Sequence, residues 1–196
     1  MRLLVGLGNP GSRYAKNRHN IGFVTADAIA RRYGFSPFKS RFKGALAEGL
    51  LAGEKRLLLK PQTYMNDSGE SVGAVARFFK LASEEVLVFH DEIDLRPGKV
   101  RAKLGGGNAG HNGLRSIDAE IGPLYWRVRL GIGHPGLKEL VYPYVLQDFS
   151  RAEIETWAGP LIDAVVEALP LLLKGAPDAF MSEVARLSPP PSEEDE

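Results

Sequence analysis

The sequence predicts an α/β fold in which one twisted, mixed β-sheet carries helices on both faces. Residues 3–7 and 86–89 are continuous apolar runs without polar alternation, a pattern typical of strands buried on both sides. Segments with apolar residues at helical spacing alternate with such strands along the chain. Because no internal repeat or linker interrupts this alternation, we expect a single domain over residues 1–187.

The composition is that of a globular protein and excludes several kinds of site. Of the 196 residues, 44% are apolar and 25% are charged, close to average proportions. Cysteine is absent, which excludes disulfides, thiolate metal sites and thiol nucleophiles. No run approaches the ~20 apolar residues of a membrane span, and no signal-peptide pattern precedes the first strand. We therefore expect a cytoplasmic protein without membrane contact.

Charge is unevenly distributed along the chain. The formal net charge is +1, and subtracting the −4 of the last four residues leaves +5 on residues 1–192. A mildly basic body suggests an anionic partner. Residues 188–196 read Ser-Pro-Pro-Pro-Ser-Glu-Glu-Asp-Glu and have no apolar surface to bury. We expect them to form a disordered, acidic, proline-rich tail.

The first strand ends in a turn that places polar side chains at the edge of the sheet. Residues 8–11 read Gly-Asn-Pro-Gly, where proline fixes φ and glycine permits positive φ. His19 follows just before a helical pattern over residues 22–33, which Gly34 ends. A strand that stops in a glycine-rich turn beside a helix start is how an α/β sheet builds a site.

The middle of the chain continues the alternation after a basic loop. Residues 45–51 and 56–59 predict a hairpin that turns near Gly53, and a helix capped by Asp67 or Ser68 runs to residue 79. The later elements expected in order are a buried strand at 86–89 ending in the polar cluster 90–94, an extended basic segment at 99–103, a glycine-rich loop at 105–113, a helix at 114–121 and a strand at 126–130.

The C-terminal part is predicted to be helical. Ser150 and Glu153 have capping-box spacing and open the region. Pro160 must kink or restart the helix, and Pro177 suits the first turn of a last helix to Leu187.

The polar side chains at the expected strand ends indicate acid–base chemistry. An imidazole of near-neutral pKa needs a partner that fixes its tautomer and stabilises its charged form. Asp91, at the end of a buried strand, is the natural partner of His19 if that strand neighbours the first. Neither a G-x-S-x-G elbow nor a cysteine is present, so His19 is left as a general base acting on water.

Three separate loops each contribute an asparagine, at positions 9, 66 and 112. A side-chain amide can donate to a carbonyl and accept from a peptide N–H. Each asparagine alone is more often a turn former. Together, at separate strand ends, they suggest a clamp for a peptide.

Two other kinds of site fit the motifs less well. Residues 6–11 match G-x-G-x-x-G, but Pro10 lies inside the turn and no helix is expected at Gly11, so we interpret the match as turn chemistry. A metal could bind the acidic residues of the 90–94 cluster together with His90 and either His111 or His134. No histidine pair has the spacing of zinc hydrolases, so a metal site is the minority interpretation.

Six motifs are spread over residues 1–149. They are Gly6-Leu-Gly-Asn-Pro-Gly11, Arg18-His-Asn-Ile-Gly22, Lys60-Pro-x-Thr-Tyr-Met-Asn66-x-Ser-Gly69, His90-Asp-Glu-Ile-Asp94, Gly105-Gly-Gly-x-x-Gly-His-Asn-Gly113 and Arg129-Leu-Gly-Ile-Gly-His-Pro135. They occur in the order seen in bacterial-type peptidyl-tRNA hydrolases, so the chain resembles that family. Arg96 and Asn17 stand where a second proline and a threonine are common in relatives.

The resemblance implies hydrolysis of the ester that joins a peptide to the 3′ end of tRNA. This reaction recycles tRNA from peptidyl-tRNA that has dropped off ribosomes. His19 would activate water, Asp91 would stabilise the competent form of His19, and Asn9 would discriminate N-blocked from free aminoacyl substrates. The alternative is a non-catalytic RNA-binding or processing relative, against which the intact histidine, aspartate and asparagines argue.

The resemblance also implies the residues that bind substrate. Those implied for the peptide and the 3′ CCA end are Tyr14, Tyr64, Asn66, Gly110 and Asn112, with backbone amides of the 105–113 loop near the carbonyl. Arg101 and Lys103 would grip the 5′ phosphate; side chains two apart on a strand lie about 6.8 Å apart on one face. We expect a monomer that needs no cofactor or metal.

Overall fold

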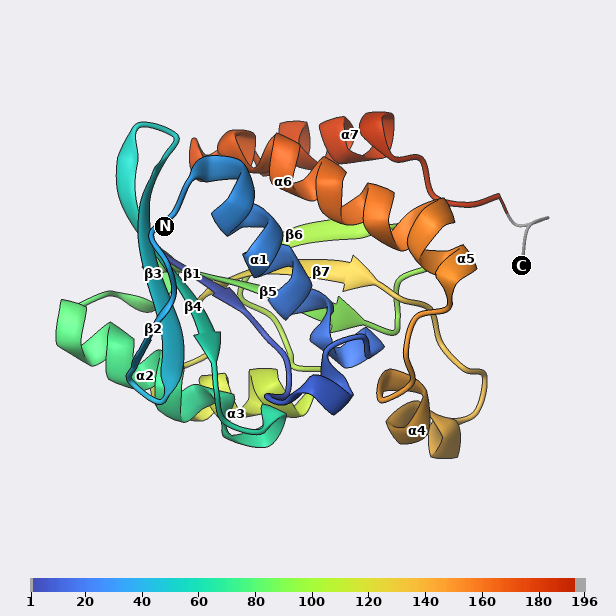
Figure 1. Ribbon diagram of the computed structural model, residues 1–196, viewed down its shortest axis with the longest axis horizontal. Coiled ribbons are helices and arrows are strands. Elements are labelled where there is room, and N and C mark those ends of the chain that lie inside the picture. The colour runs from blue at the N-terminus through green and yellow to red at the C-terminus, as the bar shows by residue number, and fades with distance from the viewer. Residues whose placement is uncertain (1, 193–196) are drawn as a thin grey trace.

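A seven-stranded mixed sheet with strand order β2-β3-β4-β1-β5-β7-β6 forms the middle layer of the computed structural model, which describes residues 2–192 (Figure 1). The strands are β1 (Leu3–Gly6), β2 (Lys39–Arg41), β3 (Gly44–Leu51), β4 (Glu54–Pro61), β5 (Val86–Glu92), β6 (Val100–Leu104) and β7 (Trp126–Gly131). β1 pairs in parallel with β4 and β5, and β5 pairs in parallel with β7. The other pairings, β2–β3, β3–β4 and β6–β7, are antiparallel.

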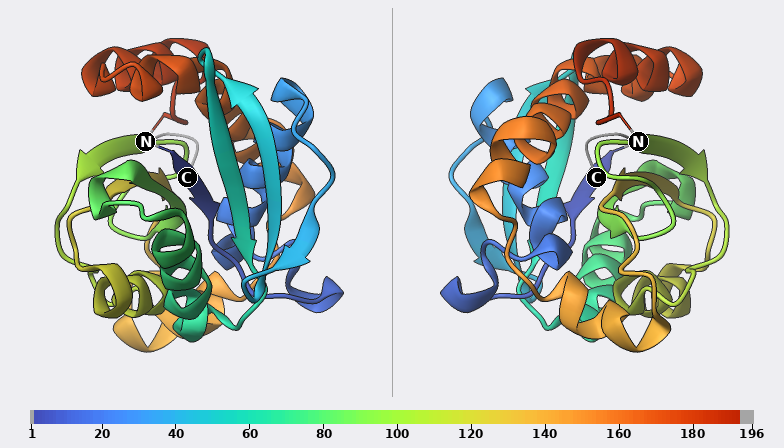
Figure 2. Two further views of the ribbon diagram at one scale, coloured as in Figure 1. Left: turned by 90° about the vertical axis from the view of Figure 1, so that its left-hand side faces the viewer. Right: turned by 90° about the vertical axis from the view of Figure 1, so that its right-hand side faces the viewer.

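Helices cover both faces of this sheet (Figures 1 and 2). One face carries α1 (Ile21–Tyr33), α6 (Gly159–Leu173) and α7 (Pro177–Leu187), and the other carries α2 (Ser68–Phe79) and α3 (Asn112–Ile121). Alternate residues of β1 and β5 enter the two cores: Leu4 and Leu87 pack with α1 and α6, whereas Val5 packs with α2. The expectation of doubly buried strands and of an α/β fold is confirmed.

α1 lies close against β1 and β5 because its second residue is glycine. A Cβ placed on Gly22 would lie 2.4 Å from the amide nitrogen of Leu7 and 2.4 Å from the carbonyl oxygen of Phe89. Any larger residue would push the helix away from the sheet. This close approach brings His19, three residues earlier, to the carboxyl end of β5.

Several boundaries differ from the sequence prediction. β2 lies inside the expected basic loop; its three exposed polar residues carry no apolar alternation that could have revealed it. β5 extends through Glu92, so the polar cluster expected after the strand begins within it. α3 starts at Asn112 rather than Leu114. A short helix, α4 (Val141–Val145), was not predicted.

The predicted cap of α2 is only partly right. Asp67 occupies the N-cap position, but its side chain makes no capping hydrogen bond. The Ser68 hydroxyl instead donates to the carbonyl oxygen of Met65 at 2.8 Å. The 3₁₀ turn Met65–Asp67 leads directly into α2. The Asp67 side chain therefore does not cap the helix.

The C-terminal region confirms its predicted signals. Ser150 Oγ accepts from the Glu153 amide at 3.1 Å, and Glu153 Oε2 accepts from the Ser150 amide at 2.8 Å, so the capping box opens α5 (Arg151–Glu153). Pro160 lies in the first turn of α6, and Pro177 opens α7.

One segment corrects the expectation about membrane spans. The continuous helical stretch Arg151–Leu173 is long and apolar enough to cross a membrane by length and composition. Within its most apolar window, 56% is buried, and Leu161, Val165 and Leu169 are fully buried in the core of the α1 face. This packing is that of a core helix.

The chain after α7 begins by returning to the sheet. The Ser188 side chain is buried, and its amide donates to the carbonyl oxygen of Val184 at 2.8 Å. Pro190 and Pro191 lie beside Gly98, just before β6. Residues 193–196 lie outside the described residues, so the predicted disorder of the acidic end stays a prediction.

Candidate active site

The candidate site lies at the carboxyl ends of the central strands, where the chain crosses from one side of β1 to the other. β1 leads through α1 to the β2–β4 side, whereas β4 leads through α2 to β5 on the opposite side. Open α/β sheets bind ligands at such switch points. A cavity of about 640 Å³ occupies this position. Eight of the residues proposed from the sequence line it: Asn9, Tyr14, His19, Tyr64, Asn66, Asp91, Gly110 and Asn112.

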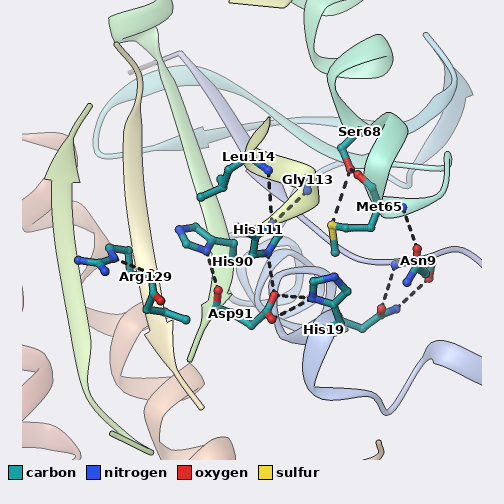
Figure 3. Close-up of polar contacts among 12 residues, drawn as sticks. Asn9, His19, Met65, Ser68, His90, Asp91, His111, Gly113, Leu114 and Arg129 are labelled. Carbon is teal, nitrogen blue, oxygen red and sulfur yellow. Dashed lines mark hydrogen bonds and ion pairs between the residues drawn. The ribbon is translucent and has the colours of Figure 1, made fainter. Parts of the chain in front are cut away.

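His19 and Asp91 are in direct contact, although 72 residues separate them along the chain (Figure 3). Nδ1 of His19 lies 2.9 and 2.8 Å from the two carboxylate oxygens of Asp91. A carboxylate only accepts, so Nδ1 carries the proton and Nε2 keeps its lone pair. The pairing of β1 with β5 produces this contact. His19 therefore has the tautomer that a general base requires.

The electrostatics of the pair stabilise charge on both partners. Burial lowers the pKa of the His19 imidazole, but the charge and hydrogen bond of Asp91 together outweigh burial and raise it. Burial alone would raise the pKa of Asp91, which is 3% exposed. The charge that His19 gains on protonation, and the hydrogen bonds from both His19 and His111, instead hold that pKa well below its ordinary value. Asp91 thus stays ionised and favours the imidazolium form of His19.

His111 is a second partner of Asp91 that the sequence reasoning missed as a site residue. Its Nε2 donates to Asp91 Oδ1 at 3.0 Å. Its Nδ1 accepts from the amides of Gly113 and Leu114 at 3.1 and 3.4 Å, so the side chain caps α3. These amides can only donate, which fixes the neutral tautomer of His111. From the sequence, His111 was proposed only as a metal ligand. Its position immediately before α3 became clear because the helix begins two residues earlier than predicted.

His90 contacts the backbone of Asp91 rather than its carboxylate. Its Nδ1 donates to the carbonyl oxygen of Asp91 at 2.7 Å, and its ring packs edge-on against His111 with centroids 5.1 Å apart. Burial lowers the pKa of His90 to about 3. His90 is therefore neutral near pH 7 and adds no charge beside His19.

Asn9 is oriented by a set of reciprocal hydrogen bonds. Its Oδ1 accepts from the Met65 amide at 2.8 Å. Its backbone amide donates to Asn20 Oδ1, and Asn20 Nδ2 donates back to its carbonyl oxygen, both at 2.9 Å. Because Oδ1 is engaged, Nδ2 is the group that Asn9 can offer to a ligand. Asn20 was not singled out from the sequence as a positioning residue.

The glycine-rich loop does not fully match its expected role. Gly110 lines the cavity, but its amide donates to Asn108 Oδ1 at 3.2 Å. The amides of Gly113 and Leu114 are engaged by His111. These three backbone donors are therefore not available to a substrate carbonyl in this conformation, and the asparagine side chains are the better candidates.

Arg101 and Lys103 lie apart from the cavity. Both are exposed on β6, the outermost strand on that side of the sheet, and neither lines the cavity. They face the same way as Arg129 and Arg127, which pair opposite them on β7. Arg129 and Arg127 form ion pairs with Glu92 and Asp118. Arg101 and Lys103 have no ion pair with any residue between 2 and 192.

The residues that the sequence suggested as metal ligands do not come together at one point. The Glu92 carboxylate binds Arg129 at 2.8 Å and accepts from the Asp94 amide at 3.1 Å. Among residues 2–192, the cluster with metal-ligand spacing is His19, Asp91 and His111. Their contacts of 2.8–3.0 Å suit hydrogen bonds, whereas ligands of a tetrahedral zinc ion lie about 3.4 Å apart.

The dinucleotide interpretation fails on local structure. After β1 the chain enters a 3₁₀ turn at Ser12–Tyr14, and α1 begins only at Ile21. No helix N-terminus follows the glycines to receive a pyrophosphate. The match to G-x-G-x-x-G is therefore turn chemistry, as the sequence indicated.

A segment before α5 forms one wall of the cavity and was not foreseen. Its lining residues are Lys138, Val141, Tyr142, Val145 and Leu146. Arg18 ties this segment to the His19 turn: its guanidinium donates to the carbonyl oxygen of Asp148 at 2.9 Å and pairs with Glu153 at 2.8 Å. Its stacking over Tyr144, 4.5 Å from the ring centroid, adds a further contact.

Known proteins share this sequence and architecture. A sequence model of the family described as Peptidyl-tRNA hydrolase matches residues 3–192. The chain is 57% identical over 191 residues to the peptidyl-tRNA hydrolase of Rhodospirillum centenum, covering 97% of this chain and 84% of that protein. It is 61% identical over 184 residues to that of Bradyrhizobium diazoefficiens, covering 94% and 91%. The crystal structure of peptidyl-tRNA hydrolase from Acinetobacter baumannii has a TM-score of 0.90 and 42% identity, with 96% of each chain covered.

Proposed function

The chain belongs to the peptidyl-tRNA hydrolase family, and on that premise we propose that His19, held by Asp91, activates the water that cleaves the peptide–tRNA ester. The observation that carries this proposal is the contact of 2.8–2.9 Å between Nδ1 of His19 and the Asp91 carboxylate. This contact leaves Nε2 of His19 able to act as a base beside a cavity lined by asparagine side chains. The biological role would be recycling of tRNA from prematurely released peptidyl-tRNA, by a cytoplasmic monomer.

The proposed reaction proceeds by general base catalysis. Nε2 of His19 accepts a proton as the water oxygen attacks the ester carbonyl, and Asp91 stabilises the resulting imidazolium. The tetrahedral intermediate then expels the 3′ oxygen of the terminal ribose, which takes the proton back from Nε2. The peptide leaves with a free carboxyl group and the tRNA with a free hydroxyl. An ester has a good enough leaving group for this route without a nucleophile from the protein.

Side-chain amides would hold the substrate. Asn9 offers Nδ2. The exposed Asn66, in the 3₁₀ turn before α2, and the exposed Asn112, the first residue of α3, line the same cavity. Amide donors can stabilise the developing oxyanion and bind the peptide carbonyls. Tyr14 and the exposed Tyr64 provide aromatic faces for the terminal base or the peptide.

Arg101 and Lys103 would bind the 5′ phosphate of the acceptor stem. They alternate on one exposed face of β6, and their charges are not neutralised by described residues. Their distance from the catalytic cavity suits a substrate whose two ends are held at different points. Recognition through the tRNA ends and the peptide backbone would make the enzyme indifferent to peptide side chains.

Replacing His19 should remove most of the catalytic rate. His19→Ala is expected to lower kcat by about 10² to 10⁴, the usual range for a general base, and Asp91→Asn should lower it less. His134→Ala is the matched control: this histidine lines the same cavity but makes no hydrogen bond to Asp91. Retention of more than about a hundredth of the rate in His19→Ala would refute the role. A chelator should leave the wild-type rate unchanged.

Asn9→Asp should reduce the preference for N-blocked substrates. Aspartate can keep the contact with the Met65 amide but replaces the Nδ2 donor by a carboxylate, which attracts a free ammonium group and repels a carbonyl. The ratio of kcat/KM for N-acetyl-aminoacyl-tRNA over aminoacyl-tRNA should fall at least about tenfold, the equivalent of one charge-assisted hydrogen bond. An unchanged ratio would show that Asn9 does not discriminate between the two substrates.

Removal of the 5′ phosphate from the substrate should raise KM for the wild-type enzyme. The same change should have little effect on an Arg101→Gln/Lys103→Gln variant, because the proposed phosphate contacts are already lost. KM of the wild type should also rise with salt concentration, as expected for phosphate binding by cations. A wild-type KM that is insensitive to both changes would exclude the phosphate site.

A further inference from the structure

The basic face of β6 carries cations that the described chain does not neutralise. Arg101 and Lys103 alternate along one exposed face of the strand, and Lys99 immediately precedes it. None of the three forms an ion pair with residues 2–192. The neighbouring arginines of β7 are paired with carboxylates. This face is therefore open to an anionic group.

The end of α7 delivers the chain to this same edge of the sheet. Val184 and Pro190 line a groove of about 240 Å³ together with Lys99 and Arg101. A Cβ added at Gly98 would lie 3.0 Å from Cδ of Pro191 and 3.3 Å from Cα of Pro190. The prolines therefore lie directly against the chain that enters β6, and proline limits how the following residues can leave.

The residues that come next have the complementary charge. Glu193, Glu194, Asp195 and Glu196 carry four negative charges in succession. Four extended residues reach up to about 14 Å. Arg101 lies three residues beyond Gly98, about 10 Å along the strand. The acidic segment is thus tethered within reach of Lys99 and Arg101.

We propose that the acidic segment 193–196 occupies the Arg101 end of the basic face and competes there with the phosphates of RNA. The inference rests on the proposed function, because it requires Arg101 to contact substrate phosphate. Tethering keeps the segment at a high effective concentration, while each exposed ion pair is weak and screened by salt. RNA with several phosphates displaces the segment, whereas weaker anionic ligands are excluded.

The test neutralises the segment without shortening it, by Glu193→Gln, Glu194→Gln, Asp195→Asn and Glu196→Gln together. At about 50 mM salt, KM for 5′-phosphorylated N-acetyl-aminoacyl-tRNA should fall about threefold to tenfold, with kcat unchanged. The difference should vanish near 1 M salt, where the screening length is about 3 Å. A short CCA ester without a 5′ phosphate should show no change in KM.

Two matched variants separate local competition from net charge. Neutralising four exposed carboxylates elsewhere, those of Glu54, Glu84, Glu155 and Asp178, changes the net charge equally and should leave KM within about twofold. In an Arg101→Gln background, neutralising the acidic segment should give no gain. An unchanged KM in the neutralised enzyme, or a full gain in the Arg101→Gln background, would overturn the proposal. A gain that depends on enzyme concentration would place the contact between two copies and also overturn it.

The outcomes distinguish this proposal from the proposed function. Absence of ester cleavage by the wild type would refute the hydrolase mechanism, and an Arg101→Gln enzyme with wild-type KM would refute the phosphate contact. If the wild type does not cleave the ester, fluorescence anisotropy with 5′-phosphorylated acceptor-stem RNA still measures whether the acidic segment competes with RNA for the basic face. Tighter binding by the neutralised enzyme supports it, and equal binding refutes it.

Discussion

The geometry of the site depends on one buried carboxylate shared by two imidazoles. Asp91 receives hydrogen bonds from His19 and His111 at 2.8–3.0 Å, while His90 binds its carbonyl oxygen. An isolated carboxylate at this depth would cost several kcal/mol in lost hydration. Hydrogen bonds to a charged group each return about 1.5–3 kcal/mol. The two imidazoles therefore make it possible for Asp91 to remain ionised inside the protein.

Each contact of Asp91 depends on a separate feature of the fold. The parallel pairing of β1 with β5 sets the two strand ends side by side, and Gly22 allows α1 to approach them closely. His111 is fixed because its other nitrogen caps α3. Arg18 joins the His19 turn to the wall of the cavity. His19 is thus oriented by tertiary packing rather than by its local sequence.

Much of this arrangement could be predicted from residue patterns. Some features depend only on the local sequence, and the structure confirms them. They are the continuous apolar strands, the capping box at Ser150 and the prolines at 160 and 177. The contact of His19 with Asp91 was conditional on strand order, which no local pattern fixes. His111 and Asn20 were missed because their roles arise only when distant loops meet. β2 and α4 were missed because the first is exposed and polar and the second is short.

The most direct test of the coupling between His19 and Asp91 is an NMR titration of the His19 ring in the wild type and in Asp91→Asn. Asp94→Asn serves as the control, because this exposed carboxylate makes no hydrogen bond to His19. In the wild type, we expect the pKa of His19 to lie above the ordinary value for histidine, because Asp91 stabilises the imidazolium. It should fall in Asp91→Asn, where burial remains without the compensating charge, and stay unchanged in Asp94→Asn. A His19 pKa that is the same in all three proteins would show that Asp91 does not stabilise the imidazolium.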